Sequence, residues 1–184
     1  MQLHTSRRNF PRFTLLSETL GMNRLTLILV LTLTVLLGSS GVCWGAYWEK
    51  AVDAYKRGDY ATALKEWTLL AEQGNADAQY LLGGVYFIGE GVPQDYKTAV
   101  KWTTLAAERG IASAQGNLGV MYAFGEGIPK DYVYAYMWGH IAAMNGSELG
   151  GKLRDDFEKQ MTLADISAAQ KLARECVSKN YKGC

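Results

Sequence analysis

Few side chains in this sequence could perform acid–base, nucleophilic or metal chemistry. Histidine occurs twice among the 184 residues, at His4 and His140. Beyond residue 45, His140 is therefore the single imidazole, and a catalytic or metal-binding histidine needs suitably spaced partners. No such partners accompany it in the sequence. We therefore predict a packed or surface histidine, no catalytic residue, no metal site and no cofactor.

Cys176 and Cys184 are the two thiols beyond residue 45, since the third cysteine is Cys43. In an oxidising compartment, an isolated close pair indicates a structural disulfide. Such a bond would contribute roughly 2–3 kcal/mol by closing the C-terminal tail. The alternative is a redox-active or metal-binding pair, although the spacing does not match Cys-x-x-Cys.

Asp155, Asp156 and Glu158 form an acidic cluster. Paired carboxylates can act as acid and base in glycoside cleavage. Here Arg154 and Lys159 flank the cluster on an expected surface helix. This arrangement favours a solvated, charged helix face over a catalytic pair.

Residues 78–110 and 114–146 repeat one pattern at a shift of thirty-six residues. A period of this length is typical of a stacked array of helical units. Sixteen residues are identical in the two copies; in the first they are Ala78, Gln79, Leu82, Gly83, Tyr86, Gly89, Glu90, Gly91, Pro93, Asp95, Tyr96, Ala99, Trp102, Ala106, Ala107 and Gly110.

Each copy predicts two helices joined by a glycine-rich loop. Apolar residues recur at helical spacing before and after the loop. The loops at Gly89 and Gly125 lack a following Gly-Lys-Ser/Thr, so they are expected to connect helices and not to bind phosphate. Asp95 and Asp131 should cap the second helix, and Gly110 should end it. Small residues in both helices should let neighbouring helices approach closely.

The motif Ala-Gln-x-x-Leu-Gly-x-x-Tyr, then Gly-Glu-Gly-Val-Pro-x-Asp-Tyr, then Ala-x-x-Trp-x-x-x-Ala-Ala-x-x-Gly resembles the Sel1-like repeat, a relative of the tetratricopeptide repeat. The resemblance is specific over residues 78–146 and partial over 47–77. It implies an all-α superhelix of helix pairs with a scaffold or adaptor role. The C-terminal end, with Cys176 and Cys184, is similar to that of exported bacterial members.

We accordingly divide the chain into five parts. Residues 1–45 form a targeting segment, and residues 46–77 form a first, tetratricopeptide-like unit without the glycine-rich insertion. Residues 78–113 and 114–147 form two Sel1-like repeats. In residues 148–184, apolar spacing predicts helices over about 148–161 and up to about 179, with Thr162 and Asp165 as a capping box. We expect these helices to cover the open end of the array and the cysteines to close the tail.

The N-terminal part predicts export. Residues 25–37 are an uncharged run of Leu, Thr, Ile and Val, too short for comfortable membrane spanning but suited to a signal peptide. Translation starting at Met22 would give a short basic region before it, while Arg7 and Arg8 suggest a twin-arginine signal. Cleavage after Gly45 or Gly41 would give a periplasmic or secreted protein. The alternative is anchoring to the inner membrane by residues 25–37.

The net charge limits the classes of binding partner that we expect. The formal net charge of the whole chain is +1, and residues 1–45 hold four arginines and one glutamate, so the remainder carries about −2. Without a basic block, nucleic acid and anionic membrane are not expected partners. We predict binding of an unidentified protein or peptide in the concave groove formed by the first helix of each pair.

Positions that differ between the two repeats are candidates for that contact. They include Tyr80, Phe87, Asn117 and Phe124, because exposed aromatic side chains anchor interfaces. The alternative for each is packing against the neighbouring helix pair. Two other functions stay open: binding or hydrolysis of β-lactams, as discussed for cysteine-rich members of the family, and binding of cell-wall glycan. The absence of cysteine from residues 46–175 argues against the first.

Overall fold

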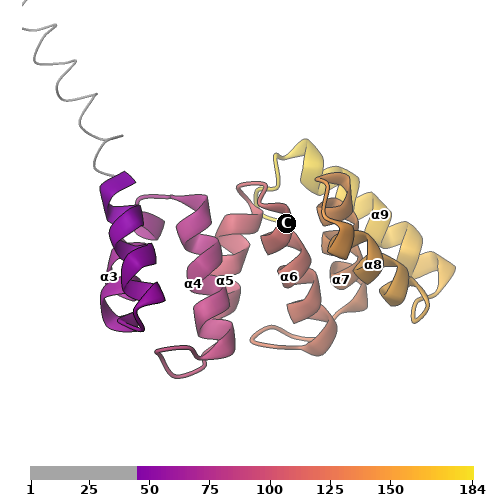
Figure 1. The fold of residues 1–184 in the computed structure, drawn as a ribbon. Coiled ribbons are helices and arrows are strands. Elements are labelled where there is room, and N and C mark those ends of the chain that lie inside the picture. The colour runs from indigo at the N-terminus through magenta and orange to yellow at the C-terminus, as the bar shows by residue number, and fades with distance from the viewer. Residues whose placement is uncertain (1–44) are drawn as a thin grey trace, which may run out of the picture. The chain divides into compact units, whose positions relative to one another are not determined.

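The computed structural model describes residues 45–184, and these residues form helices joined by turns and bends. A helix over residues 45–56 comes first, and the others follow in chain order from indigo to yellow (Figure 1). The others are α3 (Tyr60–Glu72), α4 (Ala76–Ile88), α5 (Tyr96–Ala107), α6 (Ala112–Phe124), α7 (Tyr132–Met144), α8 (Glu148–Glu158) and α9 (Leu163–Ser178). Each helix from α3 to α7 packs against the next, and both α8 and α9 pack on α7, which confirms the predicted all-α array of helix pairs.

The predicted signal peptide, the possible start at Met22 and the apolar run over residues 25–37 lie outside the described residues. Within residues 45–184, none of the helices combines the length and the apolar character that crossing a bilayer requires.

Aspartates begin the second helix of each pair. Asp95 accepts hydrogen bonds from the amides of Lys97 and Thr98 at 3.0 and 3.1 Å. Asp59 and Asp131 cap α3 and α7 in the same way. Each cap contributes about 1 kcal/mol because it pairs an amide that the helix leaves without a partner. The predicted caps at Asp95 and Asp131 are confirmed.

The second helices also end alike. Gly110 adopts a φ of +85°. The Ile111 amide donates to the Ala106 carbonyl at 3.2 Å, and the Gly110 amide donates to Ala107 at 3.0 Å. These two bonds form a Schellman motif, which favours glycine at the left-handed position. Gly74 and Gly146 repeat this geometry with φ values of +87° and +88°. The second helix of each of the three pairs therefore ends in the same backbone conformation.

Small residues allow the two helices of a pair to approach closely, as predicted. A Cβ added at Gly83 would collide with the Thr103 hydroxyl, and one at Gly119 would lie 3.0 Å from the Ala135 carbonyl oxygen. Beside these contacts Trp138 is fully buried. Burial of a side chain of this size stabilises the fold by about 3 kcal/mol.

The apolar side chains form two clusters. One joins the first two helix pairs and includes Trp67, Leu70 and Leu82. The other joins α5 and the third pair to α8 and α9, and it includes Trp138 and Phe157. The last two helices therefore cover one end of the array, because they pack on α7.

The helix predicted over about 148–161 is shorter, ending at Glu158. The Gln160 amide turns back to the Phe157 carbonyl at 2.9 Å. Thr162 then begins α9, with its hydroxyl and Asp165 forming the predicted capping box. The turn is required because the cap residue must leave helical geometry before a new helix starts.

Cys176 and Cys184 form a disulfide, with Cα atoms 5.5 Å apart, as predicted. Asn180 and Tyr181 make the reversal that brings them together, with φ values of +51° and +64°. The tail then contacts repeat residues: the Tyr181 hydroxyl donates to Asn145 at 3.1 Å, and the Gly183 amide donates to Glu108 at 2.9 Å. The disulfide thus holds the tail against the ends of α5 and α7, in the second and third helix pairs.

Candidate functional site

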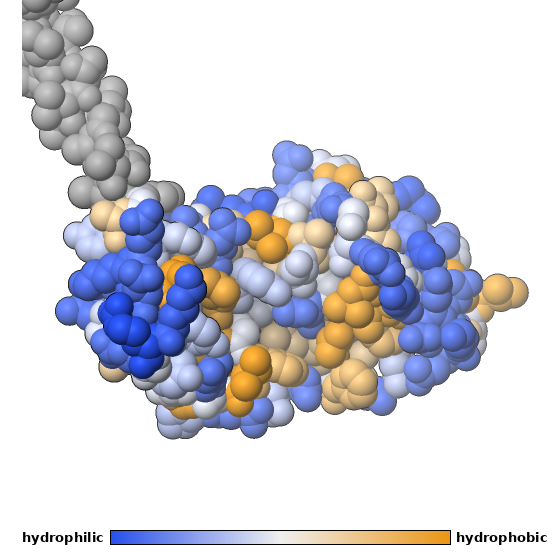
Figure 2. All heavy atoms as spheres, in the orientation of Figure 1, coloured by the Kyte–Doolittle hydropathy of each residue, from blue (hydrophilic) through white to orange (hydrophobic). Residues whose placement is uncertain are grey.

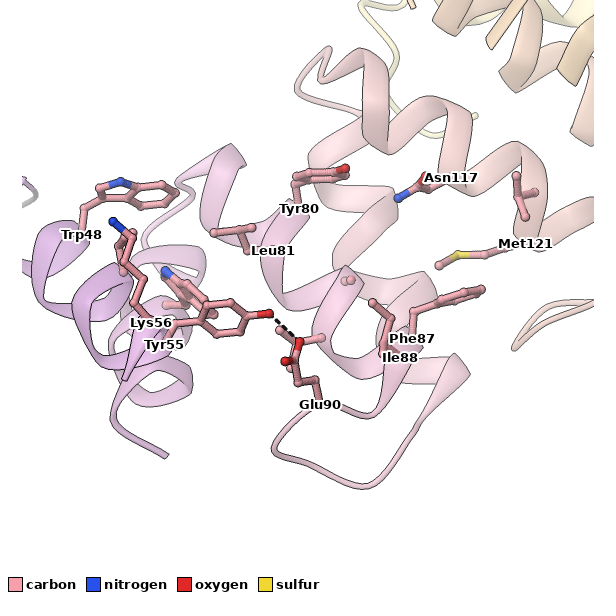
Figure 3. Close-up of a pocket in the computed structure, with 16 residues that line it drawn as sticks. Trp48, Tyr55, Lys56, Tyr80, Leu81, Phe87, Ile88, Glu90, Asn117 and Met121 are labelled. Atoms are coloured by element: carbon pink, nitrogen blue, oxygen red, sulfur yellow. Dashed lines mark hydrogen bonds between the residues drawn. The ribbon is translucent and has the colours of Figure 1, made fainter. Parts of the chain in front are cut away.

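A groove of about 670 Å³ runs along the first helices of the three pairs. Its walls come from the helix over residues 45–56, from α4 and from α6, with additions from α3 and from the loop after α4 (Figure 3). Its lining residues are Trp48, Val52, Tyr55, Lys56, Trp67, Tyr80, Leu81, Gly83, Gly84, Val85, Phe87, Ile88, Glu90, Asn117, Val120 and Met121.

Helical spacing on α4 explains how one element supplies seven of the sixteen lining residues. Tyr80, Gly84 and Phe87 recur at intervals of four and three residues, so they share a face. Ala78 and Leu82 fall on the opposite face and are fully buried. A Cβ added at Gly84 would meet no atom within 4 Å, so this glycine leaves the middle of the groove open.

Glu90 fixes one edge of the groove. Its carboxylate accepts hydrogen bonds from the Tyr55 hydroxyl and, at 2.9 Å, from the Tyr60 hydroxyl. These hydrogen bonds to Glu90 raise the pKa of both tyrosines, because they stabilise the protonated hydroxyls. The Tyr55 and Tyr60 rings meet edge to face, with centroids 5.4 Å apart. The loop of the second repeat is thereby attached to the first helix pair.

Several polar atoms of the groove have no partner among residues 45–184. The indole Nε1 of Trp67 is buried without a hydrogen-bond acceptor. The Tyr80 hydroxyl and the Asn117 amide make no side-chain hydrogen bond to another described residue. Lys56 makes no ion pair with another described residue. The groove therefore combines apolar walls with a few polar side chains that are not fully buried, Lys56, Tyr80 and Asn117, which is the usual character of a binding site.

The structure brings three of the four predicted contact residues together. Tyr80, Phe87 and Asn117 all line the groove, and Figure 3 shows them on its wall. Tyr80 and Phe87 also pack partly against the second apolar cluster, as the packing alternative expected, and partner contact at these positions stays a prediction. Phe124 does not line the groove; its side chain is 70% exposed at the end of α6.

The comparison of the second and third repeats missed the contribution of the first helix pair. Trp48, Tyr55, Lys56 and Trp67 all lie there. The first unit lacks the glycine-rich insertion, so an alignment of the other two repeats gives its side chains no counterpart. The useful signal was the density of aromatic residues in the stretch from Tyr47 to Trp67.

The residues with catalytic potential lie away from the groove. His140 is on α7, with its ring 6.0 Å from that of Tyr136. Its Nδ1 is buried without a partner. Burial lowers the pKa of His140, and the charges of Arg154 and Arg174 lower that pKa further. Within the described part of the chain, no three His, Cys, Asp or Glu side chains are grouped to hold a metal ion.

The acidic cluster on α8 is a solvated helix face, as predicted. Asp155, Asp156 and Glu158 are all exposed. Asp155 pairs with Arg154 at 2.6 Å and Asp156 pairs with Lys159 at 2.7 Å. Exposed pairs of this kind contribute about 0–1 kcal/mol and leave no carboxylate in an enclosed site.

Apolar side chains reach the surface as separate patches among polar residues (Figure 2). Among the large hydrophobic side chains that the structure describes, Leu163 on α9 has the highest exposed fraction, 86%, and Phe124 follows with 70%. These single residues need no functional explanation, because apolar atoms make up much of any protein surface.

Part of the sequence matches a known protein family. The sequence profile described as Sel1 repeat matches residues 76–111 and 112–147. Both matches start two residues before the boundaries expected from the sequence pattern. No curated protein matches the chain.

Two solved structures are similar to the chain. The first is a protective antigen present in uropathogenic Escherichia coli strains that displays an SLR fold, with 27% identity and a TM-score of 0.69 over 75% of this chain. The second is a Sel1 repeat protein from Oxalobacter formigenes, with 34% identity and a TM-score of 0.55 over 58% of this chain. The matched parts cover 31% and 44% of those two chains, so each is much longer than the region compared.

Proposed function

Because the chain is a Sel1 repeat protein, we propose that it is a scaffold that binds another protein or a peptide in the groove along the first helices of its repeats. The observation that carries the proposal is the groove itself, an apolar space of about 670 Å³ with Trp48, Tyr55, Tyr80 and Phe87 in its walls. Aromatic side chains in a partly enclosed site provide much contact area at a small entropic cost, and they dominate many interfaces.

The array itself supports recognition and not turnover. The groove combines side chains from three helix pairs, so a ligand lying along it would contact the whole stack. An extended or helical segment suits such a shape, because its side chains can enter successive hollows between helices. The groove holds a single carboxylate, Glu90, and two tyrosine hydroxyls already donate to it.

We further propose that the protein acts outside the cytoplasm. The Cys176–Cys184 disulfide supports this location, because such bonds persist in oxidising compartments. Alkylation of thiols in intact cells, followed by mass measurement, should find both cysteines protected until a reductant is added. Free thiols in the freshly extracted protein would contradict the proposed location.

Site-specific photocrosslinking in cells tests the groove. A photoreactive phenylalanine at Ile88, a groove residue that is 69% exposed, should give discrete crosslinked products. The same group at Leu163, on α9 and outside the groove, is the matched control and should give none.

A second change makes the test specific. Gly84→Leu should fill the middle of the groove without a clash, because no atom lies within 4 Å of the new Cβ. It should abolish the crosslinks from position 88 while circular dichroism and melting temperature stay unchanged. Crosslinks that survive Gly84→Leu would contradict binding in the groove. Purified protein should leave a chromogenic β-lactam intact; hydrolysis would favour the enzymatic alternative.

A further inference from the structure

Asn145 and Gly146, at the end of α7, combine a labile sequence with a backbone position that requires glycine. Gly146 has a φ of +88°, and it ends α7 as Gly110 ends α5. An asparagine followed by glycine is prone to deamidation, because glycine has no side chain to hinder attack by its amide nitrogen. The other asparagines of residues 45–184 precede alanine, leucine or tyrosine. The fold therefore keeps a chemically labile dipeptide at this helix end.

Deamidation at this position needs water and no enzyme. The Gly146 amide nitrogen loses its proton to solvent base and bonds to Asn145 Cγ, while the bond from Cγ to Nδ2 breaks and ammonia leaves. Water then opens the resulting succinimide at either carbonyl, which gives aspartate or isoaspartate at position 145. Each product carries a carboxylate in place of the amide.

The folded structure holds both reacting groups apart from each other. The Gly146 amide donates to the Ala143 carbonyl at 3.0 Å, so its nitrogen belongs to the hydrogen bonding of the helix end. The Asn145 side chain is held at both atoms. Its Nδ2 donates to Gln115 Oε1 at 2.8 Å, and its Oδ1 accepts from the Tyr181 hydroxyl at 3.1 Å. Attack on Cγ requires these contacts to open first.

The contact from Tyr181 depends on the disulfide-closed tail. Tyr181 and Asn180 adopt φ values of +64° and +51°, a left-handed conformation that is unfavourable for residues other than glycine. The bond between Cys176 and Cys184 closes the loop around them. Without it, both residues can relax to ordinary φ values, which moves the Tyr181 hydroxyl away from Asn145.

The remaining contacts of the tail are too weak to replace the disulfide. Lys182 pairs with Glu108 at 3.8 Å, and the Lys182 side chain is 58% exposed. The Gly183 amide donates to the same carboxylate in an exposed position. Exposed ion pairs contribute little to stability. The covalent loop is therefore the main restraint on the position of Tyr181.

We infer that Asn145 is a deamidation site that the Cys176–Cys184 disulfide keeps closed through Tyr181, so that loss of this bond starts deamidation. A dithiol that reduces the disulfide supplies two electrons and two protons and is itself oxidised to a disulfide. The inference does not involve the groove, so its failure leaves the proposed function unaffected.

Deamidation would make the loss of the disulfide permanent. Gln115 is fully buried, and its Nε2 donates to the Ala107 carbonyl at 3.1 Å while its Oε1 accepts from Asn145. A carboxylate at position 145 has no hydrogen to donate. Gln115 then either faces it with an acceptor or turns and gives up Ala107. Reoxidation of the cysteines cannot restore this pair.

Mass spectrometry of proteolytic peptides tests the inference on the purified full chain. The protein is incubated in mildly alkaline buffer with and without dithiothreitol, and the fraction of aspartate and isoaspartate at position 145 is followed with time. We expect dithiothreitol to raise the rate about tenfold, because deamidation then needs only a local opening of the helix end. Cys184→Ala should show the same rate without reductant, and dithiothreitol should not change it.

Tyr181→Phe separates the hydroxyl from the disulfide. This variant keeps the bond and the aromatic ring but loses the hydrogen bond to Asn145, so the rate should rise about threefold. Asn180 is the control within the same tail: it is released together with Tyr181 but is not followed by glycine, and its amide should persist. Circular dichroism checks that the helices remain after reduction; if they do not, Tyr181→Phe decides the outcome.

Three results would overturn the inference. The first is an equal rate at Asn145 in oxidised and reduced protein whose helices remain. The second is an increase at Asn180 as large as that at Asn145, because the following glycine would then be irrelevant. The third is an unchanged or slower rate in Tyr181→Phe, because the hydroxyl would then not protect the amide.

Discussion

The second and third repeats share most of their local structure but differ in what their buried polar groups meet. Gln79 and Gln115 occupy the same position, and each donates to a carbonyl of the preceding helix pair, at 2.9 and 3.1 Å. The Gln115 carbonyl accepts a hydrogen bond from Asn145 at 2.8 Å, whereas that of Gln79 is buried without a partner. Arg109 stands at the position equivalent to Asn145 and packs over Gly74 instead.

The loop glutamates differ in the opposite sense. Glu90 accepts hydrogen bonds from Tyr55 and Tyr60. One oxygen of Glu126, in the third repeat, is buried without a partner. The ring centroids of Phe87 and Tyr96 are 5.4 Å apart, as are those of Tyr55 and Tyr60 in the first helix pair. Phe87, however, lacks the hydroxyl that Tyr55 donates. Identical residues thus give identical helices and loops, while the preceding unit decides which of their hydrogen bonds form.

The largest effect is expected at the loop glycine of the third repeat. Gly127 has a φ of +74°, and an added Cβ would collide with the Tyr96 carbonyl. Gly127→Ala should lower the free energy of unfolding by about 2–5 kcal/mol, from backbone strain together with overpacking. Urea unfolding followed by circular dichroism measures this change.

Gly58→Ala is the control for backbone strain alone. Its φ is +78°, but a Cβ there would meet nothing within 4 Å. The expected loss is about 1 kcal/mol. Equal losses at Gly58 and Gly127 would show that the loop does not press against the preceding helix pair.

Removal of the disulfide should destabilise the third repeat and its covering helices. Cys184→Ala opens a loop that spans a sequence separation of 8, which should cost roughly 2–3 kcal/mol. This change avoids a cavity at the buried Cys176. Reductant should lower the stability of the original protein by a similar amount and leave that of Cys184→Ala unchanged. A further loss in the variant would mean that reductant acts elsewhere.

The two glutamines should respond differently to the same substitution. Gln115→Leu removes two hydrogen bonds, the one from the Asn145 amide nitrogen and the one to the Ala107 carbonyl, whereas Gln79→Leu removes only the one to the Ala71 carbonyl. We expect Gln115→Leu to be more destabilising by about 1–2 kcal/mol. A double-mutant cycle with Asn145→Ala should assign the difference to that pair. A coupling energy near zero would refute the assignment.

The loop glutamates should show a smaller contrast. Glu90→Gln weakens two hydrogen bonds from tyrosine hydroxyls and should cost about 1 kcal/mol. Glu126→Gln neutralises a half-buried carboxylate that has one buried, unpartnered oxygen, so stability should change by less than about 0.5 kcal/mol or increase. A greater loss at Glu126 than at Glu90 would contradict the contrast between the loops.

The smallest effect concerns pH and should come from the third repeat. Burial lowers the pKa of His140 in the folded protein. Its contribution to stability is therefore present above the unfolded pKa of about 6.5 and is lost as the pH falls through the lower folded value. His140→Gln should make stability less dependent on pH between about 5 and 7. An unchanged pH profile from urea unfolding would refute this role.

The sequence by itself determined the helices, their caps and their stacking. Periodic apolar residues, Asp95 and Asp131 at the caps and Gly110 at a helix end act within a few residues of the chain, so local rules suffice to locate them. The same holds for the disulfide, because its two cysteines are close in sequence. The end of α8 was misjudged because the apolar spacing continues to Met161, which lies in the turn before Thr162.

Only the tertiary structure decided which side chains line the groove and which polar atoms in it have no partner. Trp67, Lys56 and Glu90 come from two different helix pairs, and their contacts depend on how those pairs pack. Repeat comparison marked Tyr80, Phe87 and Asn117, which line the groove, but it could not separate them from Phe124, which lies outside it. The physical reason is range: helix formation depends on neighbours along the chain, whereas groove contacts join residues some thirty positions apart.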